Sequence, residues 1–144
     1  MDMSEGSWNA AIAGHFGVPV IMMSGDDAAI REVRSLVGPI EAAEVKKSLG
    51  FHSANTITPE ASVSLIGDRV RSALRRVRDF TPYRITQPVT LDVTFKHYRV
   101  AEVLAYLRGV ERISSHSIRY VGNTMPEIAD FMLVVTNYSL GLEP

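Results

Sequence analysis

The sequence predicts an α/β fold in which helices flank a mixed sheet, and three observations support this expectation. Apolar residues recur at helical spacing in some segments of the 144-residue chain and alternate with polar ones in another. The chain is 46% hydrophobic and 22% charged, a balance that allows a buried core. Two prolines and no periodicity mark residues 81–88 as an extended connector. We expect a helix-strand-helix unit near the N-terminus and a strand-helix-strand-helix unit after the connector.

Residues 7–16 predict a helix with Trp8, Ile12 and Phe16 on one stripe, ended by Gly17. The apolar run 18–23 then predicts a buried strand. Parallel pairing is expected for this early part of the sheet. A turn follows at residues 24–27.

Asp26 or Asp27 is placed to cap a second helix, which Gly38 and Pro39 end. Its apolar residues are Ile30, Val33, Leu36 and Val37. Residues 41–47 predict a short strand. Thr58 is expected to cap a long helix with Pro59 in its first turn, where the missing N–H costs nothing. The buried stripe predicted for this helix consists of Ile66, Val70, Ala73, Leu74 and Val77.

The second part begins at residue 89, where apolar and polar residues alternate to residue 96 as in an antiparallel strand with one solvated face. A helix with Val100 and Leu107 on its apolar side should end at Gly109. Residues 113–121 predict one or two strands. A capping-box spacing at residues 124–127 then precedes a last helix over residues 128–138.

Composition excludes several classes of function. The formal net charge is −1, so no overall field attracts nucleic acid or an anionic membrane. The longest apolar run is too short to cross a bilayer, and the first residues lack the basic start of a secretory signal. The chain has no cysteine and its four histidines are scattered, so no local metal motif is visible. We expect a soluble cytoplasmic protein.

Five arginines that fall on the long helix or just after it raise the alternative of nucleic-acid binding. On a helix they spread over the side opposite the apolar stripe, and no aromatic residues lie among them. A solvated charged face is the better interpretation. The five residues are Arg69, Arg71, Arg75, Arg76 and Arg78.

Three spaced motifs together resemble the zinc-dependent D-aminopeptidases. They are Glu-x-x-x-Asn-Ala from Glu5, Gly-x-x-x-Val-Pro-Val from Gly14, and Gly-Asp-Asp from Gly25. The resemblance continues through Val45-Lys46 and Thr58-Pro59-Glu60-Ala61, and weakens to pattern alone after the connector. It implies a metallopeptidase that removes an N-terminal D-amino acid from short peptides. Two zinc ions would polarise the scissile carbonyl and acidify a bridging water.

The resemblance implies that Glu5 is a metal ligand, whereas the residues alone favour an ordinary helix-start glutamate stabilised by the helix dipole. Asn9, one turn later, would support that ligand or the substrate; its other interpretation is a backbone hydrogen bond. Lys46 would reach a substrate carboxylate or an interface, although a strand-end lysine is usually only solvated. Phe51 and His52 replace more polar, often basic, family residues. Helix capping alone explains the Gly-Asp-Asp motif.

The family's remaining metal ligands and its proposed catalytic histidine would all precede Glu5. By resemblance, residues 1–80 form the C-terminal part of the metal-binding α/β domain, and residues 89–144 form a smaller α/β subdomain. One ligand cannot hold a zinc pair, so we expect the chain alone to be inactive. A truncated sequence, a proteolytic fragment and a natural half-protein completed by a separate N-terminal half are the open explanations.

The resemblance also implies ring-shaped homo-oligomers. Self-association would cover apolar surface that a missing half leaves exposed. The alternative function is a non-catalytic oligomeric assembly or binding protein that kept the fold without the metal domain.

Overall fold

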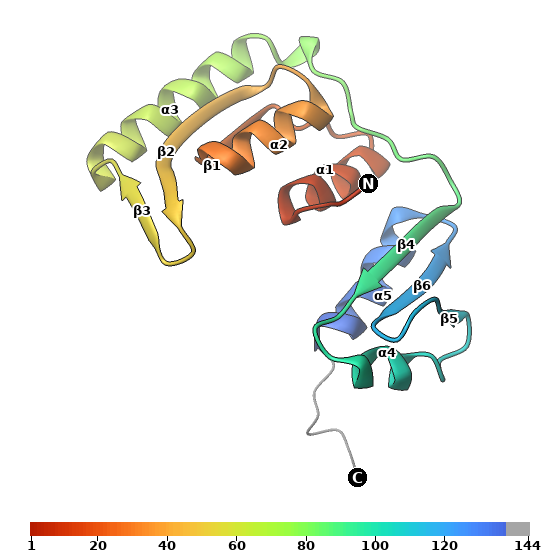
Figure 1. Cartoon of the computed structure of the whole chain (residues 1–144). Coiled ribbons are helices and arrows are strands. Elements are labelled where there is room, and N and C mark those ends of the chain that lie inside the picture. Colours follow the sequence, from red (N-terminus) through yellow and green to blue (C-terminus); the bar gives the residue numbers. More distant parts are fainter. Residues whose placement is uncertain (138–144) are drawn as a thin grey trace. The chain divides into compact units, whose positions relative to one another are not determined.

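A computed structural model of the protein describes residues 1–137. The chain folds into two compact units, residues 1–84 and a second unit that begins at Ile85. Residues 80–88 form neither helix nor strand, so the division falls inside the stretch where two prolines predict a connector. The α/β fold class is confirmed (Figure 1). Position 138, the last residue of the predicted final helix, lies outside the described residues.

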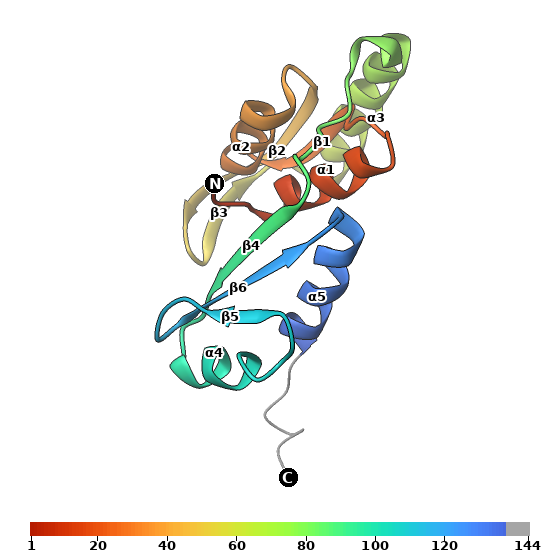
Figure 2. The same cartoon turned by 90° about the vertical axis from the view of Figure 1, so that its right-hand side faces the viewer.

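The first unit contains three strands, three α-helices and a short 3-10 helix. In chain order they are α1 (Glu5–His15), β1 (Met22–Asp26), α2 (Asp27–Val37), β2 (Glu41–Gly50), β3 (Ser53–Thr56), α3 (Pro59–Arg75) and η1 (Val77–Asp79). The sheet has the order β1-β2-β3. β1 runs parallel to β2, which pairs antiparallel with β3, so the sheet is mixed as predicted. Helices α2 and α3 lie on opposite faces of β1 and β2 (Figures 1 and 2).

The helix caps of this unit follow the sequence closely. The Asp26 side chain accepts a hydrogen bond from the Ala29 N–H (2.8 Å), and Gly38 ends α2 with a φ of 89°. Thr58 accepts from the Ala61 N–H at the start of α3. These caps are local, because each joins residues three positions apart. Both predicted helix starts are therefore confirmed.

The helix predicted over residues 7–16 is present as α1, but its large apolar stripe is not its buried face, and the strand predicted over residues 18–23 is wrong in its start. The buried face of α1 consists of Ser7, Ala10, Ala11 and Gly14. The predicted stripe is half-exposed instead, and Phe16 at its end is 67% exposed. The strand begins four residues later than predicted, because Gly17 takes a positive φ and the Val18 N–H bonds back to the Ala13 carbonyl. That Schellman-type closure keeps Val18 at the end of α1 instead of in the sheet.

Close backbone approach explains why α1 buries small residues. A Cβ added to Gly14 would lie 1.6 Å from the Tyr83 carbonyl oxygen, so no side chain fits there. Small side chains on the same face allow the helix to lie against its neighbours. Sequence periodicity identifies large apolar residues, and here the large ones lie away from the contact.

The predicted stripe of α3 is also largely wrong. Only Ala73 of that stripe is buried, and Leu74 is 57% exposed. Val63, outside the stripe, is exposed as well. α3 therefore covers the sheet with a narrow contact and presents apolar side chains to solvent, which is typical of a surface that another protein segment covers.

The arginines at the end of α3 are partly engaged within the unit. Arg76 donates to the Glu41 carboxylate (3.0 Å), and Arg69 lies 3.6 Å from the same side chain. Burial alone would raise the pKa of Glu41, but the hydrogen bond and charge of Arg76 outweigh it and lower that pKa. Arg71 pairs with Asp68.

The second unit contains β4 (Val89–Thr94), α4 (Tyr98–Leu104), β5 (Val110–Arg112), β6 (Ser117–Gly122) and α5 (Met125–Asn137). Its sheet is antiparallel with the order β4-β6-β5. The alternation predicted for β4 is confirmed, because Val89, Leu91 and Val93 are covered while Thr90, Asp92 and Thr94 are exposed. One core cluster joins Ala101 and Leu104 of α4, Ile118 of β6 and Val135 of α5.

Two boundaries in this unit differ from prediction. α4 ends at Leu104 rather than at Gly109, since the residues that follow form turns closed by Leu107 and Val110 N–H groups. The predicted range 113–121 holds one strand, β6, and a further strand, β5, comes before Ile113. Arg112 stabilises the intervening bend by donating to the carbonyls of Ser114 and Ser115.

The predicted capping box before α5 forms only in part. Thr124 accepts from the Glu127 N–H (3.3 Å), as expected. The Glu127 carboxylate accepts from the Asn123 N–H (2.7 Å), one residue before the expected donor, and from the Tyr120 hydroxyl (3.1 Å). These bonds, led by the one from Asn123, lower the pKa of Glu127.

The lowered pKa of Glu127 predicts that the second unit loses folding stability in acid. Because the folded pKa of Glu127 lies below its ordinary value of 4.5, its contribution to stability is complete above that pH and is lost as the pH falls through the folded pKa. Glu127→Gln should destabilise the unit at neutral pH and flatten the acid limb of its stability curve. Urea titrations between about pH 7 and pH 3, followed by NMR signals of β6, would measure both effects.

Glu102→Gln provides the matched control, because Glu102 is an exposed glutamate of α4 with no hydrogen bond or ion pair among the described residues. It removes a carboxylate without removing the bonds at Asn123 and Tyr120. An equally steep acid limb for Glu127→Gln and the parent chain would contradict the assignment.

Candidate functional site

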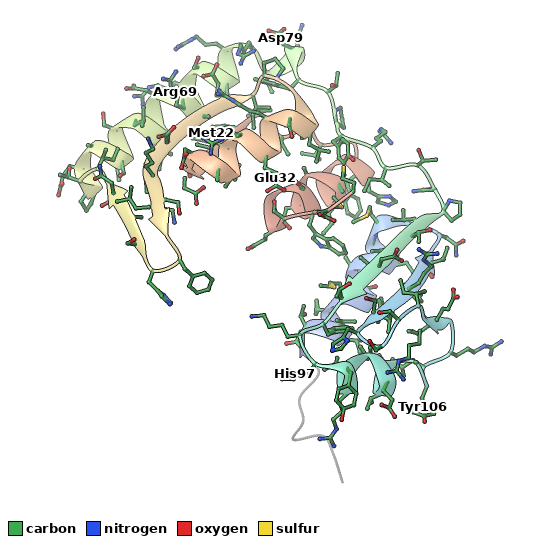
Figure 3. The ribbon with its side chains drawn as sticks, in the orientation of Figure 1. Met22, Glu32, Arg69, Asp79, His97 and Tyr106 are labelled. Carbon is green, nitrogen blue, oxygen red and sulfur yellow. The ribbon has the colours of Figure 1, made fainter. Side chains whose placement is uncertain are left out.

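The start of α1 is fastened to α2 by one carboxylate. Glu32 on α2, labelled in Figure 3, accepts from the Ser4 N–H (3.1 Å) and from the Ser7 hydroxyl (2.8 Å) through the same oxygen. Ser4 also caps α1 by accepting from the Ser7 N–H (3.4 Å). Three polar groups thereby fix the first turn of the helix that carries Glu5.

Glu32 is a positioning residue that sequence reasoning missed. Hydrogen bonds from Ser4 and Ser7 lower its pKa, so it stays charged at neutral pH. It lies 28 residues after Ser4, and no local spacing connects the two. The only available signal was the pair of serines at the helix start, which indicates a cap and does not indicate a distant acceptor.

Glu5 and Asn9 lie on the exposed side of this helix, one turn apart. Neither side chain makes a hydrogen bond or an ion pair within residues 1–137. As a first-turn residue, Glu5 lies near the N-terminal end of the helix dipole. Glu5 is therefore held on a rigid element with both carboxylate oxygens available to a ligand.

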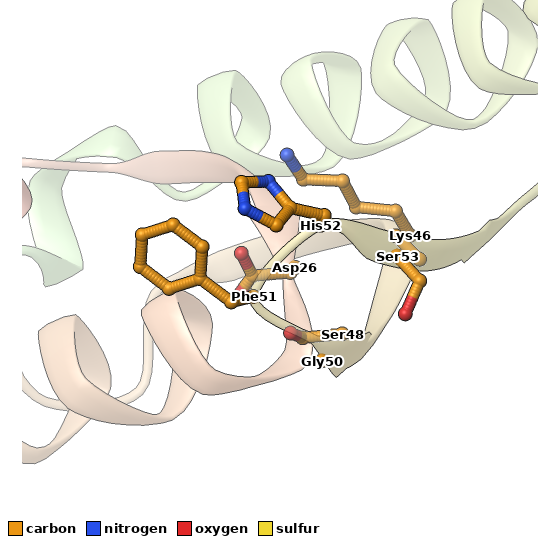
Figure 4. A pocket seen from close by; sticks show the side chains of 8 residues that line it. Asp26, Lys46, Ser48, Gly50, Phe51, His52 and Ser53 are labelled. Carbon is orange, nitrogen blue, oxygen red and sulfur yellow. The ribbon is translucent and has the colours of Figure 1, made fainter.

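Lys46 lies on another part of the same unit. It is exposed on β2, where its register partner in the parallel strand β1 is Asp26. Both residues line a pocket of about 400 Å³ together with Phe51 and His52 at the tip of the β2–β3 hairpin (Figure 4). Glu5 and Asn9 do not line this pocket. The structure thus brings one candidate residue together with groups that sequence spacing had left apart.

The two aspartates of the Gly-Asp-Asp motif have structural roles. Asp26 caps α2, and Asp27 forms an ion pair with Arg31 (2.8 Å) one turn later. The hydrogen bond from Arg31 lowers the pKa of Asp27. Asp27 also accepts from the Ser48 N–H (3.4 Å), which links the start of α2 to the hairpin. The motif therefore shapes the pocket wall.

Residues 1–137 contain no cluster of three or more histidine, cysteine, aspartate or glutamate side chains that could hold a metal ion. A catalytic zinc site needs about three protein ligands and an open position. Glu5 can supply one oxygen ligand, so the described residues do not fit a complete zinc site. In the same part of the chain no helix is long and apolar enough to span a bilayer.

The fold and these motifs define a class of metallopeptidase-like α/β proteins, and comparison with known proteins specifies it. The model of the D-aminopeptidase family matches residues 1–134. The chain belongs to this family, as the three spaced motifs predicted. The match to the family model includes the connector and the second unit up to residue 134, where the sequence shows no specific family motif.

A curated sequence and a solved structure from Bacillus subtilis are both similar to most of this chain. The D-aminopeptidase of strain 168 is 26% identical over 133 residues, which cover 92% of this chain and 48% of that protein. The structure of the zinc-dependent D-aminopeptidase DppA, a self-compartmentalizing protease, matches with a TM-score of 0.88 and 27% identity. That match covers 93% of this chain and 49% of DppA. The chain thus spans about half the length of these relatives.

Proposed function

We propose that this chain is part of a zinc metallo-aminopeptidase that removes the N-terminal D-amino acid from short peptides. The observation that carries the proposal is the TM-score of 0.88 to a zinc-dependent D-aminopeptidase at 27% identity. The exposed first-turn carboxylate of Glu5 supports it, because α1 presents a rigidly placed oxygen donor without a competing partner among the described residues. Asn9 would orient that carboxylate or the peptide from the next turn.

Glu5 would act as one ligand of a site that other protein segments complete. The described residues contain no group of three or more potential metal ligands, so no step of hydrolysis is assigned to them. The ligands that are missing would come from the part of the family fold that this chain does not span, either in one longer polypeptide or as a separate N-terminal half. Lys46 would contribute to substrate binding and not to metal binding.

We also propose self-association of the completed protein. The structural neighbour DppA is described as self-compartmentalizing. In this chain, exposed apolar side chains on α3, including Val63 and Leu74, provide surface that association would bury. This same surface favours the second candidate function, a non-catalytic assembly protein of the family fold. Zinc content and activity of the completed protein separate the two candidates.

The proposal predicts that the purified chain alone hydrolyses no D-alanyl peptide and retains little zinc. Joining it to the N-terminal half of a family member should restore both properties, because the joined protein supplies the missing ligands. Release of D-alanine and metal content after dialysis would be measured for each form. Metal-dependent hydrolysis by the chain alone would contradict the incomplete-site proposal, whereas absence of zinc and activity in both forms would favour the assembly protein.

A further inference from the structure

The pocket beside the β2–β3 hairpin is lined by alternate residues of one strand face. Lys46, Ser48 and Gly50 line it, whereas Lys47 and Leu49 do not. The hairpin tip and the end of β1 complete its wall (Figure 4). The full lining consists of Asp26, Lys46, Ser48, Gly50, Phe51, His52, Ser53 and Ala54.

Lys46 is the available cation of this pocket. Its ammonium makes no ion pair or hydrogen bond within the described residues. Asp26, the only acidic residue in the lining, already accepts from the Ala29 N–H. His52 and the hydroxyls of Ser48 and Ser53 add polar groups that can donate to an anion.

The hairpin tip adds an apolar wall. Phe51 is 97% exposed, and its ring packs edge-on against the His52 imidazole with 4.7 Å between ring centroids. A solvent-exposed aromatic ring beside a lysine provides contact area for an aliphatic chain next to an anionic group. The combination suits a small amphipathic anion better than an inorganic ion.

We propose that this pocket binds the C-terminal carboxylate of a short peptide, with the Lys46 ammonium as the principal donor. The ligand class rests on the proposed function, because a short peptide with a free C-terminus carries one carboxylate at that end. The lining holds one lysine and one aspartate. The lysine ammonium can pair with a single negative charge, whereas the aspartate carboxylate would repel the second charge of a phosphate.

Carboxylate recognition at this place would favour short peptides with a free C-terminus. A C-terminal amide removes the negative charge while preserving the size of the ligand. Discrimination between a peptide acid and its amide is therefore the property that identifies the pocket. Phe51 would contact the C-terminal side chain and contribute area without charge.

NMR titration of the full chain with D-alanyl-D-alanine, its C-terminal amide and inorganic phosphate would test the proposal. We expect the acid to shift signals of the hairpin residues 48–54, and the amide to bind at least about tenfold more weakly, because a charge-assisted hydrogen bond is lost. Lys46→Met should reduce affinity for the acid by a similar factor. Lys47→Met is the matched control, because that lysine is adjacent in sequence and absent from the pocket lining.

The proposal would be overturned if the two lysine substitutions changed the affinity for the acid equally, or if the acid and the amide bound equally well. It would also be overturned if the acid did not shift the hairpin signals at any soluble concentration. Phosphate binding more tightly than the peptide would reassign the pocket to a dianion. Urea titration of the Lys46→Met chain would confirm that it is folded, and Phe51→Ala provides a second variant whose weaker binding the proposal requires.

These outcomes are independent of the proposed catalytic function. Binding is measured without zinc and without hydrolysis, so a completed protein that is inactive would leave the pocket result standing. Conversely, the completed protein could be active while this chain binds the peptide acid and its amide equally. That result would support the peptidase proposal and contradict the carboxylate site.

Discussion

Glu5→Ala is expected to abolish hydrolysis by the completed protein, lowering kcat by more than about a hundredfold. Removing one carboxylate ligand weakens the metal site, so zinc content after dialysis should fall together with activity. Because Glu5 is exposed and makes no contact that holds α1 on α2, the substitution should change stability by no more than about 1 kcal/mol. Activity, zinc content and urea unfolding of the same preparation would be compared.

Glu60→Ala is the matched control for this substitution. Glu60 is also an exposed glutamate in the first turn of a capped helix, α3, so it shares the helix-dipole environment of Glu5. It should leave zinc content and activity unchanged. Equal behaviour of the two variants would show that Glu5 is only a helix-start glutamate, and the ligand assignment would then be withdrawn.

Gly14→Ala is expected to destabilise the first unit by about 3 kcal/mol or more. The new Cβ would lie 1.6 Å from the Tyr83 carbonyl oxygen, so α1 or the backbone near residue 83 must move. Backbone, unlike the end of a flexible side chain, cannot rotate away. A shift of α1 would also disturb the bonds from Ser4 and Ser7 to Glu32, and thereby the placement of Glu5.

Gly67→Ala provides a control with the opposite expected sign. Gly67 also lies within a helix, but a Cβ there would meet only the flexible Arg71 side chain at 3.5 Å. Because alanine is the better helix former, this variant should gain about 0.5–1 kcal/mol. Urea unfolding followed by Trp8 fluorescence reports on the first unit. Equal stability changes for the two variants would show that Gly14 is not in close contact.

Local signals in the sequence predicted the elements that depend on neighbouring residues. The caps at Asp26 and Thr58 bond to N–H groups three residues away, so their spacing is visible in the chain. The alternation in β4 appears because one face of an antiparallel strand is covered and the other is solvated. The family motifs near the N-terminus are also short patterns of neighbouring residues, and they predicted the family that the comparisons show.

Long-range contacts were not visible in the same way. The buried face of α1 depends on the backbone at Tyr83, which lies 69 residues after Gly14 (83 − 14 = 69). Glu32 meets Ser4 across 28 positions. The apolar residues of α3 matched a helical period and yet are mostly exposed, since periodicity indicates an amphipathic surface without naming what covers it.

The α/β class, the principal helix starts, the solvated strand of the second unit and the family could all be predicted from the sequence, because these depend on local hydrogen bonding and on spaced motifs. Tertiary contacts selected the buried face of α1, the bonds through which Glu32 holds the turn that carries Glu5, and the pocket that Asp26 shares with Lys46. Those outcomes depend on close packing between segments distant in the chain, where steric fit and not local preference selects the arrangement.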